Sequence, residues 1–144
     1  MGTSSRIGFE NSDGTISCID CGSDGYPSHT GRRLVENFNT IDKVGALITL
    51  GNLSILGSKI GEFHDPRNRP QVARDEDWCC ARGRDGCRGA EGKHDVHPNE
   101  ADFGSNFEEY NYLFRNGEWL VLSHRFPTRE WYTVVSILEG ESHE

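Results

Sequence analysis

The chain has 144 residues, a usual size for one domain and enough to fold without disulfides or metals. Its formal net charge at pH 7 is −8, and its isoelectric point is near 5.2. This balance argues against direct nucleic-acid binding and against docking on an anionic membrane, because both need clustered cations. An acidic domain would instead suit a protein partner with a basic groove.

The expected compartment is the cytoplasm. The sequence begins without a charged-then-apolar leader, and no apolar run reaches the roughly 18 residues that a membrane span needs. Five cysteines are an odd number, which favours reduced thiols over a disulfide framework. We therefore expect no membrane partner.

The first predicted element is a β-hairpin. Residues 6–10 and 15–19 alternate weakly between apolar and polar side chains, as strands with one buried face do. Between them, Asp13-Gly14 supplies residue types that a tight hairpin turn favours. Two antiparallel strands are therefore expected at this end of the chain.

Two short helices are predicted to follow as an αα-hairpin. Pro27 suits the first position of a helix that reaches about residue 37, because proline has no N–H to leave unpaired there. Thr40 is a suitable cap for a second helix, whose apolar residues recur at helical spacing. Gly51 is expected to end this second helix in a left-handed conformation.

Regular periodicity is lost between about residues 57 and 105. Within this segment only residues 78–81 are predicted to form a strand. A long irregular segment inside a compact domain is usually functional or mobile. Arginines gather in its first part: they are Arg67, Arg69, Arg74, Arg82, Arg84 and Arg88.

A second hairpin and a helix are predicted toward the C-terminus. Asn116-Gly117 between two apolar runs is the strongest short-range hairpin signal in the chain. Thr128 is the predicted cap of a helix that ends at Gly140, although β-branched residues within it leave a strand as the alternative. The predicted fold class is α+β: an antiparallel sheet built from N- and C-terminal hairpins, packed with the αα-hairpin and a C-terminal helix in a single domain.

The cysteines are candidate zinc ligands. A structural zinc site needs four nitrogen or sulfur donors. Cys18-x-x-Cys21 resembles one ligand pair, but on an alternating strand these two side chains point to opposite faces. The other donor-bearing residues are Cys79, Cys80, Cys87, His64, His94 and His97. Buried or incidental thiols are the alternative, so zinc stays open as the one cofactor.

Residues around the predicted helix start form the candidate ligand site. Free N–H groups at a helix N-terminus bind anions, and forked guanidinium groups bind phosphate or carboxylate. The candidate ligand-binding residues are Tyr26, His29, Arg32, Arg33, Arg82 and Arg84, with Trp78 or Trp119 as an aromatic wall. Turn chemistry is the alternative: Asp24 would accept backbone hydrogen bonds, Gly25 would take a positive φ, and Tyr26 would pack.

Catalysis has little support in the sequence. It contains no Gly-x-Ser-x-Gly, His-Glu-x-x-His or Walker pattern. A Cys21 or Cys87 nucleophile remains an alternative, because a nucleophile and its base meet in space rather than in sequence. We therefore expect a binding protein and not an enzyme.

Several short patterns resemble a family of small proteins encoded by bacteriophages and prophages. They are Asp24-Gly25-Tyr26-Pro27, Gly31-Arg32, Leu-Gly-Asn-Leu-Ser-Ile-Leu-Gly over residues 50–57, Gly83-Arg84-Asp85, and the Tyr-x-Tyr-x-Phe and Asn-Gly-x-Trp patterns over residues 110–119. The resemblance covers about residues 14–119 and does not extend to Cys79, Cys80 and Cys87. It implies a phage origin, a host cytoplasmic location and an α+β fold, but no settled activity.

The leading functional hypothesis is a phage protein that inhibits a host defence system, in the manner of an anti-CRISPR protein. Its acidic surface would bind a host defence protein in place of nucleic acid. The candidate partner-binding residues are Glu91, Asp95, Glu100, Asp102, Glu108 and Glu109. The alternatives are a small-ligand binder that sequesters a nucleotide signal and a zinc-stabilised scaffold.

Overall fold

The computed structural model describes residues 3–65, 67–82, 84–85, 95–99, 103, 109–123, 125–128 and 130–142. The strands are β1 (Ser5–Glu10), β2 (Ile16–Cys21), β3 (Leu53–Ile55), β4 (Cys80–Ala81), β5 (Asp95–His97), β6 (Tyr110–Arg115), β7 (Glu118–Leu122) and β8 (Tyr132–Thr133). The helical segments are η1 (Pro27–Gly31, a π-helical turn), α1 (Arg32–Asn37), α2 (Ile41–Leu50), α3 (Gln71–Asp75) and α5 (Val134–Ser142). These helices and strands confirm the predicted α+β class.

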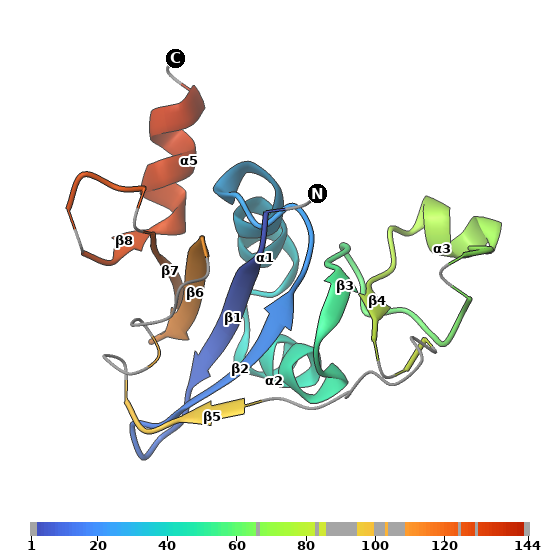
Figure 1. Ribbon diagram of the computed structural model, residues 1–144, viewed down its shortest axis with the longest axis horizontal. Coiled ribbons are helices and arrows are strands. Elements are labelled where there is room, and N and C mark those ends of the chain that lie inside the picture. Colours follow the sequence, from blue (N-terminus) through green and yellow to red (C-terminus); the bar gives the residue numbers. More distant parts are fainter. Residues whose placement is uncertain are drawn as a thin grey trace.

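The strands of the described residues form one sheet (Figure 1). Their order is β4-β3-β2-β1-β6-β7-β8, and β5 also pairs with β2. Both predicted hairpins, β1–β2 and β6–β7, are confirmed as antiparallel pairs. However, β1 pairs with β6 in parallel, and so does β2 with β3, so the sheet is mixed. Parallel neighbours need a long crossover, which the intervening helices and loops supply.

Alternating side chains divide the core between the two faces of the sheet. On one face, Ile7, Ile19 and Tyr112 of the strands pack in a cluster with Leu34 of α1, Val44 of α2 and residues of α5. The other face carries a smaller cluster, which consists of Ile16, Cys18, Leu113 and Phe103. The alternation of side chains along each strand therefore determines which strand residues lie beneath the helices.

The predicted αα-hairpin is confirmed. The chain enters it through η1, whose first residue is Pro27, as expected. Thr40 caps α2, because its hydroxyl oxygen accepts a hydrogen bond from the Lys43 N–H at 3.3 Å. Gly51 follows α2 with a φ of 92°, a value that favours glycine.

The C-terminal helix exists but begins later than predicted. Tyr132 and Thr133 first pair with β7 as strand β8, and α5 starts at Val134. Thr133 provides the cap, since its side-chain oxygen accepts from the Ser136 N–H at 3.2 Å. The prediction that Thr128 caps the helix is therefore wrong. The free edge of β7 holds the intervening β-prone residues in an extended conformation.

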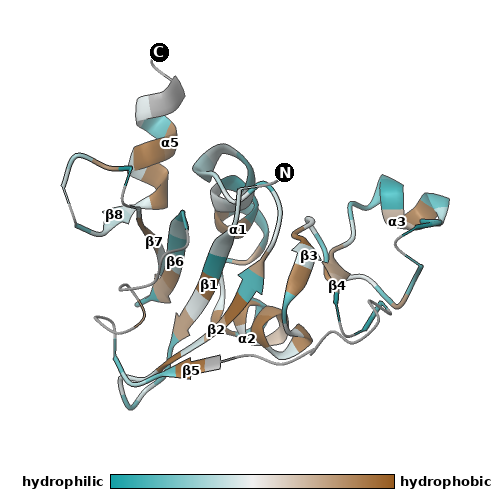
Figure 2. Cartoon of the chain, viewed as in Figure 1, coloured by the Kyte–Doolittle hydropathy of each residue, from teal (hydrophilic) through white to brown (hydrophobic). Residues whose placement is uncertain are grey.

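Residues 57–85 form a lobe, here called the α3 lobe, which includes α3 and β4 and joins the sheet at β3. Pro66 and Gly83 within it lie outside the described part. Figure 1 places α3 at the opposite end of the molecule from α5. Figure 2 shows hydrophobic residues on β3 and β4 and mainly hydrophilic ones on α3. The predicted strand is confirmed at Cys80–Ala81, whereas α3 and β5 were not predicted.

Within the described ranges, every helix is too short or too polar to pass through a lipid bilayer. Three of these helices, α1, α2 and α5, pack against one face of the sheet. Their apolar residues therefore serve the core.

Gly57 lies at the base of the α3 lobe, where the segment that follows β3 runs beside the segment that precedes β4. The Ser58 and Lys59 N–H groups both donate to the Asp77 carbonyl, at 2.7 and 3.2 Å. A Cβ atom on Gly57 would overlap that carbonyl oxygen and would lie 2.7 Å from the Trp78 carbonyl carbon. Only glycine permits the two backbone segments to approach so closely.

We predict that Gly57→Ala lowers the free energy of unfolding by about 3 kcal/mol, because backbone atoms cannot move aside as a flexible side chain can. Gly45→Ala is the matched control, since Gly45 lies within α2 and an added Cβ there meets no atom within 4 Å. This control should raise stability by about 0.5–1 kcal/mol through helix propensity. Urea unfolding followed by circular dichroism measures both, and equal effects would contradict the prediction.

Candidate functional site

The turn before η1 is built differently from the sequence expectation. Asp24, and not Gly25, has the left-handed conformation, with a φ of 52°. Gly25 is needed for a close approach instead, because an added Cβ would lie 2.8 Å from both the Ser5 Cβ and the Thr3 carbonyl oxygen. Tyr26 does not pack inside, since 39% of its surface is exposed. The predicted positive φ of Gly25 is therefore wrong, whereas Tyr26 packs at the surface against the His29 ring.

His29 lies beside this turn and is a poor anion ligand. Its Nε2 is 3.9 Å from a carboxylate oxygen of Asp24, and its ring packs edge-on against Tyr26. Burial and the nearby Arg33 charge lower the pKa of His29, although Asp24 and Asp77 oppose this shift. The imidazole is therefore neutral at neutral pH and carries no cation for a bound phosphate.

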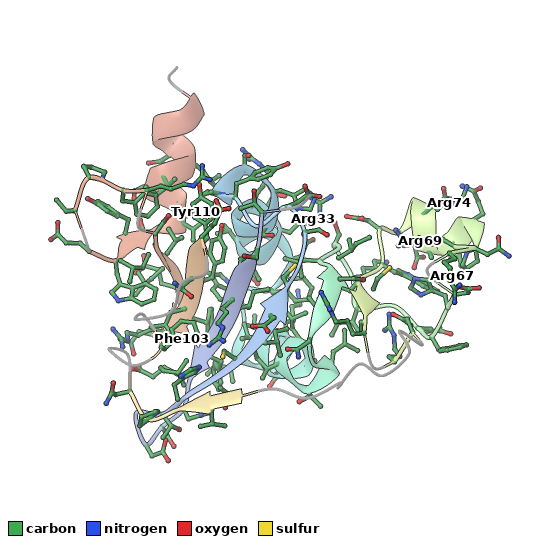
Figure 3. The ribbon with its side chains drawn as sticks, in the orientation of Figure 1. Arg33, Arg67, Arg69, Arg74, Phe103 and Tyr110 are labelled. Atoms are coloured by element: carbon green, nitrogen blue, oxygen red, sulfur yellow. The ribbon has the colours of Figure 1, made fainter. Side chains whose placement is uncertain are left out.

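Arg33 connects helix α1 to the α3 lobe. Its Nε and Nη2 both lie 3.1 Å from Oδ2 of Asp77, and the Ser58 hydroxyl donates to the same oxygen at 2.8 Å. Figure 3 shows Arg33 on the side of the helices that faces the lobe. Its neighbour Arg32 is exposed and lies 4.0 Å from Glu36. Arg33 is thus engaged in a tertiary contact, whereas Arg32 remains at the surface.

The Arg84 side chain forms hydrogen bonds inside the α3 lobe. Its guanidinium donates to the carbonyl oxygens of Ile60 and Cys79, at 2.7 and 2.8 Å. The same group forms a two-point contact with the Asp85 carboxylate, at 2.8 and 3.0 Å. These contacts use the donors that a ligand would need, so Arg84 has a structural role in this arrangement.

Asp85 is the acceptor at the centre of this network. Besides Arg84, it accepts from the backbone N–H groups of Ala81 and His64, at 2.7 and 3.2 Å. Burial alone would raise the pKa of Asp85, but the hydrogen bonds from Arg84, Ala81 and His64 outweigh it and hold the pKa below 3.8. The carboxylate is therefore ionised at neutral pH and accepts from two backbone segments, at Ala81 and at His64.

His64 and Cys80 lie next to this carboxylate. The Cys80 Sγ is 3.5 Å from Nε2 of His64, and Nδ1 of His64 is 2.8 Å from the Glu62 carbonyl oxygen. The Trp78 ring packs against the imidazole with ring centroids 5.6 Å apart. Only 1% of Cys80 is exposed, so a substrate could not reach this thiol without an opening of the lobe.

The remaining ligand candidates do not converge on one pocket. Arg82 is exposed and lies over Gly22, where an added Cβ would be 2.7 Å from its guanidinium nitrogen. Trp78 and Trp119 are buried, and each indole N–H has a hydrogen-bond acceptor. Neither tryptophan can therefore serve as an open stacking wall.

The Cys18-x-x-Cys21 pair is divided by the sheet, as the alternation of the strand predicted. Cys18 belongs to the smaller cluster and Cys21 to the cluster beneath the helices. Burial raises the pKa of Cys21 and raises that of Cys79 to about 12, so both thiols stay protonated at neutral pH. These two cysteines are therefore poor nucleophiles.

No group of three or more His, Cys, Asp or Glu side chains with metal-binding geometry occurs within the described ranges. Cys87 and His94 lie outside those ranges, and His97 contacts Arg6 on β1 at 2.9 Å. Cys80 and His64 are the donor pair that the lobe brings together.

Most of the predicted partner-binding carboxylates lie outside the described residues. These are Glu91, Glu100, Asp102 and Glu108. The Asp95 backbone belongs to β5 and pairs opposite Cys18, while its side chain is outside the described part. Glu109 is half-buried and forms an ion pair with Arg125, so its charge is locally neutralised.

A groove that the sequence did not indicate lies between the αα-hairpin and residues 58–60. Its volume is about 520 Å³, within the range of small-ligand sites. It is lined by Glu36, Asn37, Phe38, Asp42, Lys43, Ala46, Ser58, Lys59 and Ile60. None of the six predicted ligand residues lines it, because the groove depends on how the lobe docks on the helices.

Comparisons with protein-family models, with curated proteins and with solved structures found no match. The resemblance to phage proteins therefore stays a prediction from short sequence patterns.

We predict that Arg84→Ala lowers the free energy of unfolding by about 3–5 kcal/mol, because it leaves the buried Asp85 carboxylate without its cation. Arg82→Ala is the matched control, two residues away and exposed, and should change stability by less than about 0.5 kcal/mol. Thermal and urea unfolding compare the two variants. A small effect of Arg84→Ala would show that the network is not required for folding.

The low pKa of Asp85 also predicts that the stability of the fold decreases at acidic pH. Its folded pKa is depressed, so its stabilisation is complete above the unfolded-state pKa and is lost as pH falls through the folded value, below 3.8. Titration of the side-chain carboxyl carbon by NMR should give a midpoint below 3.8, and Lys in place of Arg84 should move it upward. A midpoint at or above 3.8 in the wild type would disprove this assignment.

Proposed function

We propose that this chain is a phage-encoded inhibitor of a host defence system that binds a host protein through its acidic surface. The observation that carries the proposal is that four of its arginines are largely buried in ion pairs, while others, such as Arg32 and Arg82, stay exposed. Arg6, Arg33, Arg84 and Arg115 each contact a carboxylate and keep between 16% and 27% of the side chain exposed. An ion pair has no net charge, so the excess of eight negative charges belongs to other carboxylates.

Exposed carboxylates occur on several described elements. They include Asp42 on α2, Glu62, Asp65 and Asp75 in the α3 lobe, Glu118 on β7, and Glu130. Long-range attraction depends on such uncompensated charge, which speeds encounter with a basic groove and falls with added salt. A host nuclease that binds nucleic acid in such a groove is the class of partner that this surface fits.

The same contacts disfavour the nucleotide-binding alternative. Of its candidate residues, Arg84 donates to two carbonyls and one carboxylate, and Arg33 is held by Asp77. His29 is neutral at neutral pH, because burial and the Arg33 charge lower its pKa. Arg82 and Arg32 remain exposed, and two separated cations are a weak basis for binding a phosphate.

The first experiment measures inhibition directly. The purified chain is added to a CRISPR effector complex and its labelled target DNA, and bound DNA is followed by fluorescence anisotropy. We expect the chain to displace the DNA, with an inhibitory concentration that rises at least about tenfold between low salt and 0.5 M salt.

Two charge-neutralised variants locate the surface. One replaces Glu91, Glu100, Asp102 and Glu108 by their amides, and the other replaces Asp42, Glu62, Asp65 and Asp75 in the same way. Each variant removes four negative charges, so a larger loss for the first set identifies those carboxylates as the contact. Failure to displace DNA from any such complex, or displacement that is indifferent to salt and to both variants, would reject the proposal.

A further inference from the structure

The groove between the αα-hairpin and residues 58–60 has two walls of different origin. The end of α1, the residue after it and the first turns of α2 form one wall, and the start of the α3 lobe forms the other. Phe38, Ala46 and Ile60 are the apolar residues that line it. Its volume of about 520 Å³ gives room for a small molecule or a short peptide.

The backbone along the groove already has hydrogen-bond partners. The N–H and the carbonyl of Lys59 both bond to the segment that precedes β4, at 3.2 and 2.8 Å. The Ile60 carbonyl accepts from Arg84, and the Phe38 carbonyl accepts from the Trp119 indole, each at 2.7 Å. A ligand would therefore be recognised by side chains, and not by the addition of a strand.

Charged side chains of both signs surround the apolar residues. Lys43 on α2 and Lys59 in the lobe place an ammonium group on each wall, and Glu36 and Asp42 add two carboxylates on the helical wall. Among the described residues, neither Lys43 nor Asp42 has an ion-pair partner. Lys59 and Glu36 make only long contacts, of 3.8 and 4.0 Å, to charged neighbours that do not line the groove. The four exposed charges are therefore open to a ligand and sum to zero.

These side chains suit a zwitterion better than a phosphate. Glu36 and Asp42 oppose the approach of a multiply charged anion, and the described residues that line the groove include no arginine to bind phosphate through two nitrogens. A ligand with separate ammonium and carboxylate groups can place each beside the opposite charge. Its apolar side chain can then lie against the apolar lining.

We propose that this groove binds a short zwitterionic peptide with an apolar side chain. Its carboxylate contacts Lys43 and Lys59, and its ammonium group contacts Glu36 or Asp42. A peptide bound in this way bridges α2 and the α3 lobe. The site goes beyond the proposed acidic-surface contact, because it takes a small ligand and needs no host protein. A free apolar amino acid carries the same two charges and is the other source of this chemistry.

The first test is a titration of the wild-type protein with alanyl-leucyl-alanine, followed by two-dimensional amide NMR. We expect saturable shifts at residues 36–46 and 58–60, with a dissociation constant of about 1 mM or lower. The N-acetylated and the C-amidated forms of the probe each lack one charge, and each should bind about twofold to fivefold more weakly. Leucine alone should bind more weakly than the tripeptide, and equal affinity would overturn the peptide assignment.

Variants of the groove locate the ligand. Ala46 is exposed on α2, so Ala46→Trp can fill the groove and leave the core intact. It should weaken binding by at least about tenfold, because the indole occupies the space of the ligand.

Lys43→Gln and Lys59→Gln should each weaken binding of the tripeptide by about twofold to fivefold. Neither should change the affinity of the C-amidated probe, which has no carboxylate to pair with a lysine. Arg74→Gln is the matched control, because it removes an exposed positive charge on α3, away from the groove (Figure 3). This control should bind both probes as the wild type does.

Three results would overturn the proposal. One is the absence of saturable shifts with the tripeptide up to about 10 mM. Another is equal affinity of the two capped probes and the zwitterion, and the third is wild-type affinity in folded Ala46→Trp. If that variant does not fold, the shift map and the capped probes still decide the question.

Discussion

The buried contact between Asp85 and Arg84 is the constraint on which the α3 lobe depends. In its described residues the lobe has one short helix, a two-residue strand and a single backbone bridge between Lys59 and Trp78, so little backbone pairing holds it together. The Asp85 carboxylate adds to that pairing by accepting from β4 and from the segment at His64, while Arg84 reaches Ile60 and Cys79. A buried ion pair of this kind adds little net stability over an apolar core, but it permits few alternative arrangements.

The sequence predicted best those elements whose signals are local. Gly14 and Asn116-Gly117 turn the two hairpins, and Thr40 and Gly51 bound the second helix, because each acts through its own backbone or its near neighbours. Thr128 and Thr133 are equally good caps by residue type. Only the free edge of β7, which pairs residues 132–133, decides between them.

The candidate site was harder to predict because its outcome depends on tertiary contacts. Arg82 and Arg84 are the same residue type two positions apart, yet one is exposed and the other bonds carbonyls inside the lobe. His64 and Cys80 are sixteen residues apart and no local spacing rule connects them. The opposite facing of Cys18 and Cys21 was predictable, since it follows from the strand period alone. The polar contacts inside the lobe, such as those of Arg84, therefore have to be read from the structure, whereas the strand alternation can be read from the sequence.

The parallel pairing of β1 with β6 has a consequence for how the protein is made. β1 and β6 are separated by β2, the helices and the α3 lobe in sequence, whereas the β1–β2 hairpin forms from neighbouring residues. On the ribosome, the N-terminal hairpin emerges long before its second partner, so one edge of β1 waits unpaired while the helices and the lobe are translated. Open strand edges recruit other chains, and pairing between distant segments is slow. Nascent chains should therefore need protection at this edge until β6 has been translated.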